Sequence, residues 1–201
     1  MSRSARTLRN NGLRAVRAVF LDKDGTLIEN VPYNVDPALV QLAPGAPQAL
    51  ARLSMAGFRL IVVSNQSGIG DGRFAAAALL AVERRIQALL APAAAIDAFY
   101  YCPHSRSAGC GCRKPSPGLL LRAAAEHGID LGRSWLVGDI LDDVEAGRRA
   151  GCRAALIANG NETEWQLGPF RTPHRVARSL EAAANAIVAA TQLGRQREAC
   201  A

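Results

Sequence analysis

The stretch AVFLDKDGTL, residues 18–27, joins a short apolar run to two carboxylates that stand two residues apart. The apolar run predicts a buried strand that ends at Asp22. Side chains at positions i and i+2 of an extended chain point to the same side, so Asp22 and Asp24 are expected to face one site. Carboxylates this close repel each other unless a cation neutralises them, and hard oxygen ligands favour Mg²⁺. The stretch therefore predicts a magnesium site at the end of a strand.

Beyond this stretch, apolar runs alternate with helical patterns, which is typical of a parallel sheet covered by helices on both faces. Further strands are expected at Phe58–Val63, Ile96–Tyr101, Trp135–Val137 and Ala154–Ala158. Helices are expected at Ala46–Ala56, Phe74–Leu90, Ser116–His127, Asp142–Ala150 and Ser179–Ala190, with Asp142 as the N-cap of the fourth. The short gaps between the motifs leave no room for an inserted cap domain. We predict one capless, Rossmann-like α/β domain over residues 17–191, between a basic extension (1–16) and a C-terminal tail (192–201).

Polar residues follow three of the predicted strands: Asp22, Ser64 and Asp139. Ligands of parallel α/β sheets bind beyond the carboxyl ends of the strands, so these three side chains are expected to form one site. A carboxylate held against a metal-bound phosphate can attack phosphorus, and a hydroxyl such as that of Ser64 can hold the phosphoryl oxygens. Lys114 is the candidate to neutralise the phosphate. Asp143 is a candidate to face Lys114, although the sequence does not decide between Asp142 and Asp143 as the support of the metal site.

Three thiols and one imidazole lie within eleven residues: Cys102, His104, Cys110 and Cys112. Cys₃His is a tetrahedral zinc set. Disulfides are the alternative, but we expect a reducing compartment, which favours zinc. The set ends immediately before Arg113 and Lys114. We therefore expect the zinc to make rigid the loop that presents these two cations.

The segments around Asp22, Ser64, Lys114 and Asp139 occur in the motif order of the haloacid dehalogenase superfamily of phosphatases, and the sequence resembles that superfamily over residues 17 to about 160. The resemblance implies that Asp22 is the nucleophile and Asp24 the general acid and base. It implies that Ser64 and Lys114 hold the phosphoryl group. It also implies that Mg²⁺ is bound by Asp22, the backbone carbonyl of Asp24, and Asp139.

The zinc loop, Tyr101–His104 followed by Cys110–Gly118, narrows the resemblance to the D-glycero-D-manno-heptose 1,7-bisphosphate 7-phosphatase family. The segments Asn65–Ile69 and Asn159–Glu164 are also similar to that family, whereas the span from His104 to Cys110 is shorter than in many of its members. The family implies hydrolysis of the 7-phosphate of the heptose bisphosphate. Substrate contacts are then expected from Asn30, Val31, Pro32, Tyr33, Ser64, Asn65, Gln66, Ser67, Arg113 and Lys114. Histidinol-phosphate phosphatases share the zinc loop and polynucleotide 3′-phosphatases share the aspartate chemistry, so both remain alternatives.

The net charge is +7, and four Arg with no acid fall within residues 1–14. A basic arm permits a nucleic-acid-binding module as a competing function, but the arm lacks the interleaved aromatic residues of single-strand binders, and such a module gives no role to the convergent aspartates. No stretch approaches the ~20 apolar residues of a membrane span. We therefore expect a cytoplasmic monomer that acts on a small sugar bisphosphate, without a nucleic-acid or membrane partner.

Overall fold

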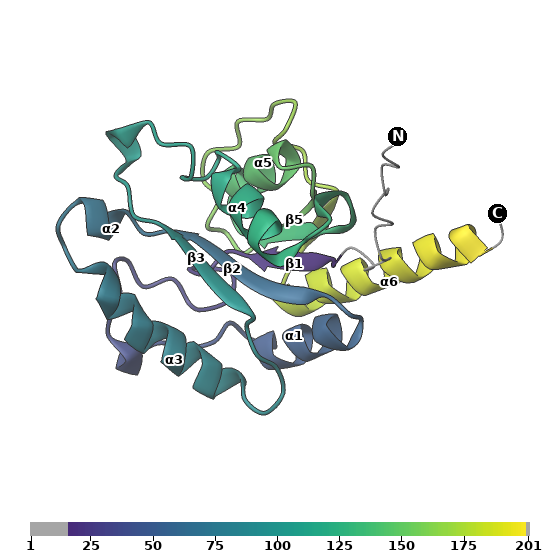
Figure 1. The fold of residues 1–201 in the computed structure, drawn as a ribbon, viewed down its shortest axis with the longest axis horizontal. Helices are drawn as coiled ribbons and strands as arrows, with labels where there is room; N and C mark the ends of the chain where they lie inside the picture. Colours follow the sequence, from purple (N-terminus) through teal and green to yellow (C-terminus); the bar gives the residue numbers. More distant parts are fainter. Residues whose placement is uncertain (1–15, 200–201) are drawn as a thin grey trace, which may run out of the picture.

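The computed structural model describes residues 16–199 of the chain, and these residues form one parallel sheet between two layers of helices (Figure 1). The strand order is β3-β2-β1-β4-β5-β6, and every neighbouring pair is parallel. The strands are β1 Ala18–Leu21, β2 Arg59–Asn65, β3 Ala98–Cys102, β4 Trp135–Gly138, β5 Arg153–Ile157 and β6 Arg175–Ala177. The predicted parallel α/β fold is therefore confirmed. The basic segment 1–14 and Cys200 lie outside the described residues.

The strand β6 has no counterpart in the sequence prediction. It is three residues long, and two of its side chains are exposed. A strand this short at the edge of a sheet carries neither an apolar run nor a measurable alternation, so periodicity could not detect it. The other five strands begin or end within a few residues of the predicted runs.

Helices of two groups cover the two faces of the sheet (Figure 1). The helices are α1 Ala46–Met55, α2 Ser67–Gly70, α3 Leu79–Leu90, α4 Gly118–His127, α5 Leu141–Arg149 and α6 Leu180–Ala199. The helices α1, α3 and α6 share one core cluster with the sheet, whereas α4 and α5 pack on the opposite face. Short 3₁₀ turns lie at Pro37–Leu39, Ala76–Ala78, Arg106–Ala108 and Leu131–Arg133.

The strand β1 is buried on both faces, as expected for the middle of a parallel sheet. Val19 and Leu21 belong to the core cluster under α1, α3 and α6, while Ala18 and Phe20 belong to the cluster under α4. All four apolar residues of β1 are therefore buried, two on each face of the sheet. The first polar residue, Asp22, stands where the sheet ends.

The start of α5 differs from the prediction. Ile140, not Asp142, is the N-cap, and the carboxylate of Asp143 accepts a hydrogen bond from the backbone N–H of Ile140 at 3.4 Å. The Asp142 N-cap assignment is wrong because Asp143 already satisfies the helix end from its third position, which leaves Asp142 to pair with Arg171 at 2.9 Å.

Three other helix ends also shift. The helix predicted from Phe74 begins at Leu79 after a 3₁₀ turn, and the one predicted from Ser116 begins at Gly118. The last helix extends to Ala199.

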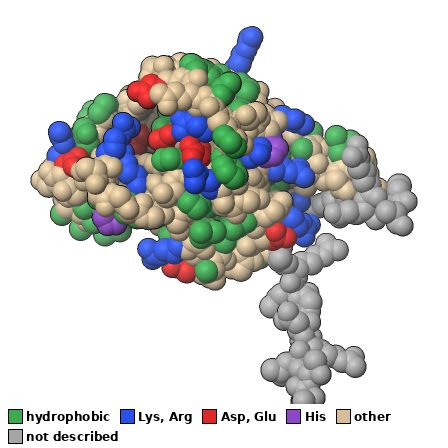
Figure 2. Space-filling view, turned by 90° about the horizontal axis from the view of Figure 1, so that it is seen from above, with side chains coloured by type: hydrophobic (Ala, Val, Ile, Leu, Met, Phe, Trp, Pro, Cys, Tyr) green, Lys and Arg blue, Asp and Glu red, His purple; other side chains and the backbone are tan. Residues whose placement is uncertain are grey.

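Among the described residues, no helix is long and apolar enough to cross a membrane. Arg and Lys side chains are spread over the face seen in Figure 2 in several groups, some with acidic side chains beside them.

Candidate active site

Three strand ends meet at one hollow of about 320 Å³. Asp22 follows β1, Ser64 lies near the end of β2, and Asp139 follows β4, and these strands are neighbours in the sheet. The backbone N–H of Asp22 donates to the carbonyl of Val137 at 2.9 Å, which ties the first strand end to the β4 strand. The three side chains that the sequence placed at one site all line this hollow, together with Lys114.

Lys114 is the centre of the site and is 3% exposed. Its ammonium group donates to the carboxylate of Asp22 and to the carbonyl of Val63 at 3.0 Å, and it forms an ion pair with Asp143 at 2.6 Å. The side chain of Asn65 holds the Lys114 backbone at two points, because its Oδ1 accepts from the N–H at 2.9 Å and its Nδ2 donates to the carbonyl at 3.1 Å. Asp143 thus faces Lys114, one of the roles that the sequence left open for it.

The carboxylates outnumber the ammonium group that they surround. Burial raises the pKa of Asp22 to about 7, against the opposing effect of Lys114 and with the help of Asp143 and Asp24. Burial also raises the pKa of Asp139 to about 6, and that of Asp143 is raised by the same cause. Burial lowers the pKa of Lys114, but its two acidic partners outweigh this effect and the net shift is upward.

This imbalance of charge favours a bound cation. One oxygen each from Asp22, Asp139 and Asp143 lies within 4.8 Å of the others, so the three groups could hold a metal ion. A divalent cation among them would stabilise the charged carboxylates that burial disfavours. Hard oxygen donors of this kind suit Mg²⁺.

Asp24 stands apart from this cluster and has its own partners. Its Oδ1 accepts from Lys23 at 2.7 Å, and its Oδ2 accepts from the amide of Gln66 at 2.9 Å. The same amide donates to Ser64 Oγ at 3.0 Å. Lys23 is 1% exposed, so it is a buried partner of Asp24 that the sequence reading left without a role. The Asp24 side chain keeps 27% exposure toward the hollow.

Asp139 is held at both carboxylate oxygens. Thr26 donates to its Oδ1 at 3.1 Å, and the amide of Asn161 donates to its Oδ2 at 2.6 Å. Neither Thr26 nor Asn161 was singled out from the sequence as a site residue, although Thr26 lies inside the quoted stretch. The contact of Asn161 with Asp139 depends on the path of the chain after β5, which no local pattern encodes.

The predicted substrate contacts fall into two groups. Most of them line the hollow around Asp22: Asn30, Val31, Pro32, Tyr33, Ser64, Asn65, Arg113 and Lys114. Ser67 lines an adjoining outer hollow of about 650 Å³ with Tyr33 and Arg113. Gln66 lies behind the hollow, 6% exposed, with its amide used by Asp24 and Ser64. Arg106, which the sequence reading did not select, lines both hollows beside Arg113.

The predicted zinc ligands come together in space. Between the sulfur atoms and the Nδ1 of His104, the distances are 3.5 Å from Cys102 and 3.2 Å from Cys112. The sulfur atoms lie 3.1 to 3.6 Å from one another. The donors around a tetrahedral zinc lie about 3.5–3.8 Å apart, and the sulfurs of a disulfide lie about 2 Å apart. Three of the observed separations match the zinc range, two are somewhat shorter at 3.1 and 3.2 Å, and all are far longer than a disulfide bond. The three cysteines are free thiols, so the chemistry and spacing of the four donors fit a metal and not a disulfide.

The zinc loop also reaches the hollow. Arg113 directly follows Cys112, and its guanidinium donates to the carbonyl of His104 at 3.3 Å. The backbone of one of the four candidate metal donors therefore contacts the guanidinium of Arg113. That zinc makes this loop rigid stays a prediction.

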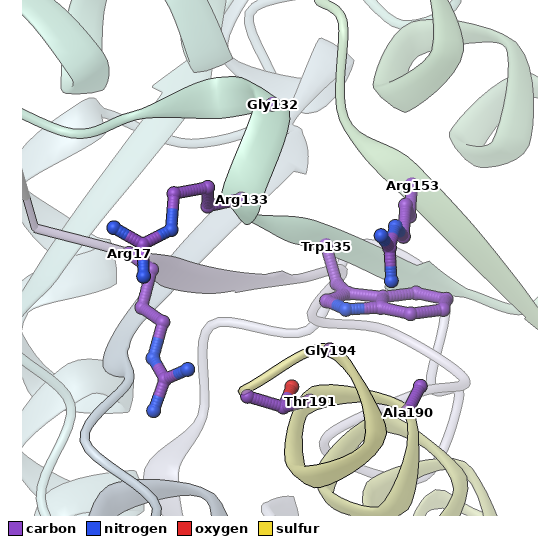
Figure 3. Close-up of a pocket in the computed structure, with 8 residues that line it drawn as sticks. All are labelled: Arg17, Gly132, Arg133, Trp135, Arg153, Ala190, Thr191 and Gly194. Carbon is purple, nitrogen blue, oxygen red and sulfur yellow. The ribbon is translucent and has the colours of Figure 1, made fainter. Parts of the chain in front are cut away.

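A separate cavity of about 100 Å³ lies at the opposite, amino-terminal end of the strands, next to Trp135 (Figure 3). Three arginines line it, but their guanidinium groups point in different directions. Arg153 lies over the indole of Trp135 at 5.6 Å, and Arg17 reaches the carbonyls of Ala56 and Gly57. The arginines do not converge on one point, so this cavity is not a candidate for the phosphate site.

Comparisons with known proteins identify the family of this chain. A family model described as HAD-hydrolase-like matches residues 111–183. The chain is 34% identical over 192 residues to the D-glycero-beta-D-manno-heptose-1,7-bisphosphate 7-phosphatase of Pseudomonas aeruginosa, a match that covers 94% of this chain and 99% of that relative. It is 38% identical over 181 residues to the D-glycero-D-manno-heptose-1,7-bisphosphate 7-phosphatase of Thermosynechococcus vestitus, covering 83% of this chain and 92% of the relative.

A solved structure is similar as well. The crystal structure of the D,D-heptose 1,7-bisphosphate phosphatase from B. bronchiseptica, complexed with magnesium and phosphate, matches with a TM-score of 0.74 and 32% sequence identity. The match covers 87% of this chain and 99% of that one.

The packing of Gly138 against Asp143 gives a testable prediction. A Cβ at Gly138 would lie 2.3 Å from three atoms of Asp143, so Gly138→Ala should push that carboxylate away from Lys114. We expect a loss of about 1–3 kcal/mol in the free energy of unfolding, measured by urea denaturation. Gly194→Ala in α6 is the control, because nothing lies within 4 Å of its added Cβ. Equal stability of Gly138→Ala and the native protein would contradict this packing.

Proposed function

The chain belongs to the D-glycero-D-manno-heptose 1,7-bisphosphate 7-phosphatase family of haloacid dehalogenase-like hydrolases, and we propose that it hydrolyses the 7-phosphate of this heptose bisphosphate with Mg²⁺ as cofactor. The observation that carries the proposal is the contact of Lys114 with Asp22 and Asp143 beside Asp139, at the ends of three strands. A buried nucleophile, a fixed ammonium group and an anionic metal cluster are the parts that phosphoryl transfer needs.

In the first step, an Oδ atom of Asp22 attacks phosphorus and the bond from phosphorus to the sugar oxygen breaks. Protonated Asp24 gives its proton to that leaving oxygen. In the second step, water attacks the aspartyl-phosphate, Asp24 takes the proton of the water, and the carboxylate of Asp22 is released with inorganic phosphate. Asp24 lines the hollow and is held by Gln66 and Lys23, which suits a group that must reach the leaving oxygen.

Lys114 and Ser64 hold the phosphoryl oxygens in this account. Lys114 is positioned by its two acidic partners and by Asn65 before substrate arrives, so little ordering remains for the reaction itself. Mg²⁺, when bound by Asp22, the backbone carbonyl of Asp24 and Asp139, supplies charge neutralisation and polarises the phosphoryl group. Asp143 supports the site through Lys114.

Zinc is the second metal of the proposal and has a structural role. Cys102, His104, Cys110 and Cys112 supply four donors and leave no open position, which is the arrangement of a structural site. Its task is to hold the loop from which Arg113 reaches the rim of the hollow.

The rim is where substrates are distinguished. Arg113 lines the hollow next to Lys114, and its planar guanidinium suits a second anionic group on the substrate. A sugar bisphosphate offers such a group, whereas a small monophosphate does not. We therefore assign to Arg113 the contact with the second phosphate, the one that is not transferred.

The covalent mechanism predicts the behaviour of two variants. Asp22→Asn should abolish turnover while it keeps the fold and the zinc content, because the amide preserves shape but is not a nucleophile. Asp24→Asn should be severely slowed, since the leaving oxygen would lack its proton. Phosphate release measures turnover, and circular dichroism checks the fold. Substantial turnover by Asp22→Asn would refute the mechanism.

The zinc assignment predicts one tightly held zinc per chain in protein purified without chelator, measured by metal analysis. Cys110→Ser should lose this zinc because one thiolate donor is gone. Cys152→Ser is the matched control, since Cys152 is a buried free thiol outside the cluster. A disulfide between two cluster cysteines in protein kept under reducing conditions would count against the assignment.

The role of Arg113 predicts a difference between substrates. Arg113→Ala should lower kcat/KM for the heptose bisphosphate by roughly 10–100-fold, the scale of one charge-assisted contact, and should affect a small monophosphate much less. Arg85→Ala removes the same charge from the exposed side of α3 and should leave kcat/KM unchanged for both substrates. An equal loss on both substrates would place Arg113 on the transferred phosphoryl group. A native preference for histidinol phosphate would leave the reaction class but overturn the substrate assignment.

A further inference from the structure

The loop that follows β5 contacts Asp139, the chain just after it, and the turn that follows Asp24. The amide of Asn161 donates to Asp139 Oδ2 at 2.6 Å. One residue on, a carboxylate oxygen of Glu162 accepts from the N–H of Leu141 at 2.6 Å, at the start of α5. Asn159 donates to the carbonyl of Gly25 at 2.7 Å, within the turn that follows Asp24. Three contacts, from Asn159, Asn161 and Glu162, therefore join this loop to both of the segments that carry metal-ligand candidates.

The packing around Asn161 is tight. A Cβ at Gly25 would lie 2.2 Å from Asp139 Oδ2 and 2.6 Å from the amide nitrogen of Asn161, and Gly25 has a positive φ of 83°. Because Gly25 has no side chain, the amide of Asn161 has room to contact the carboxylate of Asp139. Three parts of the chain therefore pack together here: the turn after Asp22, the side chain of Asp139 and the loop after β5.

The orientation of the Asp139 carboxylate is set by this contact. Thr26 holds one oxygen and Asn161 holds the other, so rotation of the carboxylate about its Cβ–Cγ bond breaks two hydrogen bonds. Asp139 is 4% exposed, whereas Asn161 is an exposed residue that lines the same hollow. The amide therefore covers a buried carboxylate and donates to its charged form.

We propose that Asn161 is a positioning residue for Mg²⁺, which it serves by fixing the Asp139 carboxylate in the orientation that binds the ion. The inference rests on the proposed function, because it requires Asp139 to be a magnesium ligand. Partners that orient a metal ligand raise metal affinity by roughly 10–100-fold, and that range is the expected scale here. Asn161 acts through Asp139 and takes no part in bond making.

The test is the magnesium dependence of Asn161→Ala. Calorimetric titration of the intact, zinc-loaded protein should show Mg²⁺ affinity lowered by roughly 10-fold or more. The Mg²⁺ concentration for half-maximal turnover should rise by the same factor, and kcat at saturating Mg²⁺ should stay close to the native value. Thr163→Ala is the control, because Thr163 is an exposed residue of the same loop. Asn159 does not serve as a control, since its Oδ1 accepts from the backbone N–H of Asn161 at 3.2 Å.

Each outcome decides the proposal. Unchanged Mg²⁺ affinity in Asn161→Ala overturns it, and so does a loss of kcat that saturating Mg²⁺ does not restore. An increase in substrate KM without a change in Mg²⁺ affinity would make Asn161 a substrate contact. Equal effects of the two variants would assign the change to the loop as a whole. A native protein that binds Mg²⁺ but hydrolyses no sugar phosphate would reject the proposed function while the affinity comparison still tests Asn161.

Discussion

The ammonium group of Lys114, buried between Asp22 and Asp143, is the interaction on which the site depends. A buried charge that loses a partner costs about 3–5 kcal/mol, so each of the three groups constrains where the others can lie. Asp22 comes from the end of β1 and Asp143 from the first turn of α5, while the β2 strand supplies the Val63 carbonyl. One side chain thereby joins three segments that are far apart in the sequence. Lys114 itself lies in the zinc loop, two residues after Cys112, and Asn65 fixes its backbone.

Two donor clusters divide the tasks of the site by their chemistry. The carboxylate oxygens of Asp22, Asp139 and Asp143 are hard donors and line the hollow in which the proposed function places the phosphate. The sulfurs and imidazole of the second cluster are borderline-soft ligands that close a loop at the rim. In the proposed function, the first cluster serves the reaction, and the second holds the rim that meets the remainder of the substrate. Arg113 is the link between them, because it contacts the loop at His104 and lines the hollow.

Much of this arrangement follows from local pattern. Apolar runs identified five strands, and the rule that parallel sheets bind ligands at carboxyl strand ends brought Asp22, Ser64 and Asp139 together before the structure was known. The grouping of the four candidate zinc donors was expected because three thiols and one imidazole lie within eleven residues. Tertiary contacts account for the rest. The choice between Asp142 and Asp143 depended on the direction of the first turn of α5. The roles of Lys23, Thr26 and Asn161 depend on contacts with residues of other segments or on their burial, which no local pattern predicts. The three-residue strand β6 is too short for any periodic signal.

The central claim is that Asp22 becomes covalently phosphorylated. The most direct measurement is borohydride reduction of enzyme quenched during turnover of the heptose bisphosphate, followed by mass spectrometry of its peptides. Borohydride reduces an aspartyl-phosphate to homoserine and leaves a free carboxylate unchanged. The account predicts homoserine at position 22, dependent on both Mg²⁺ and substrate. An unreduced Asp22 in enzyme that turns over under the same conditions, or reduction at another carboxylate, would contradict it.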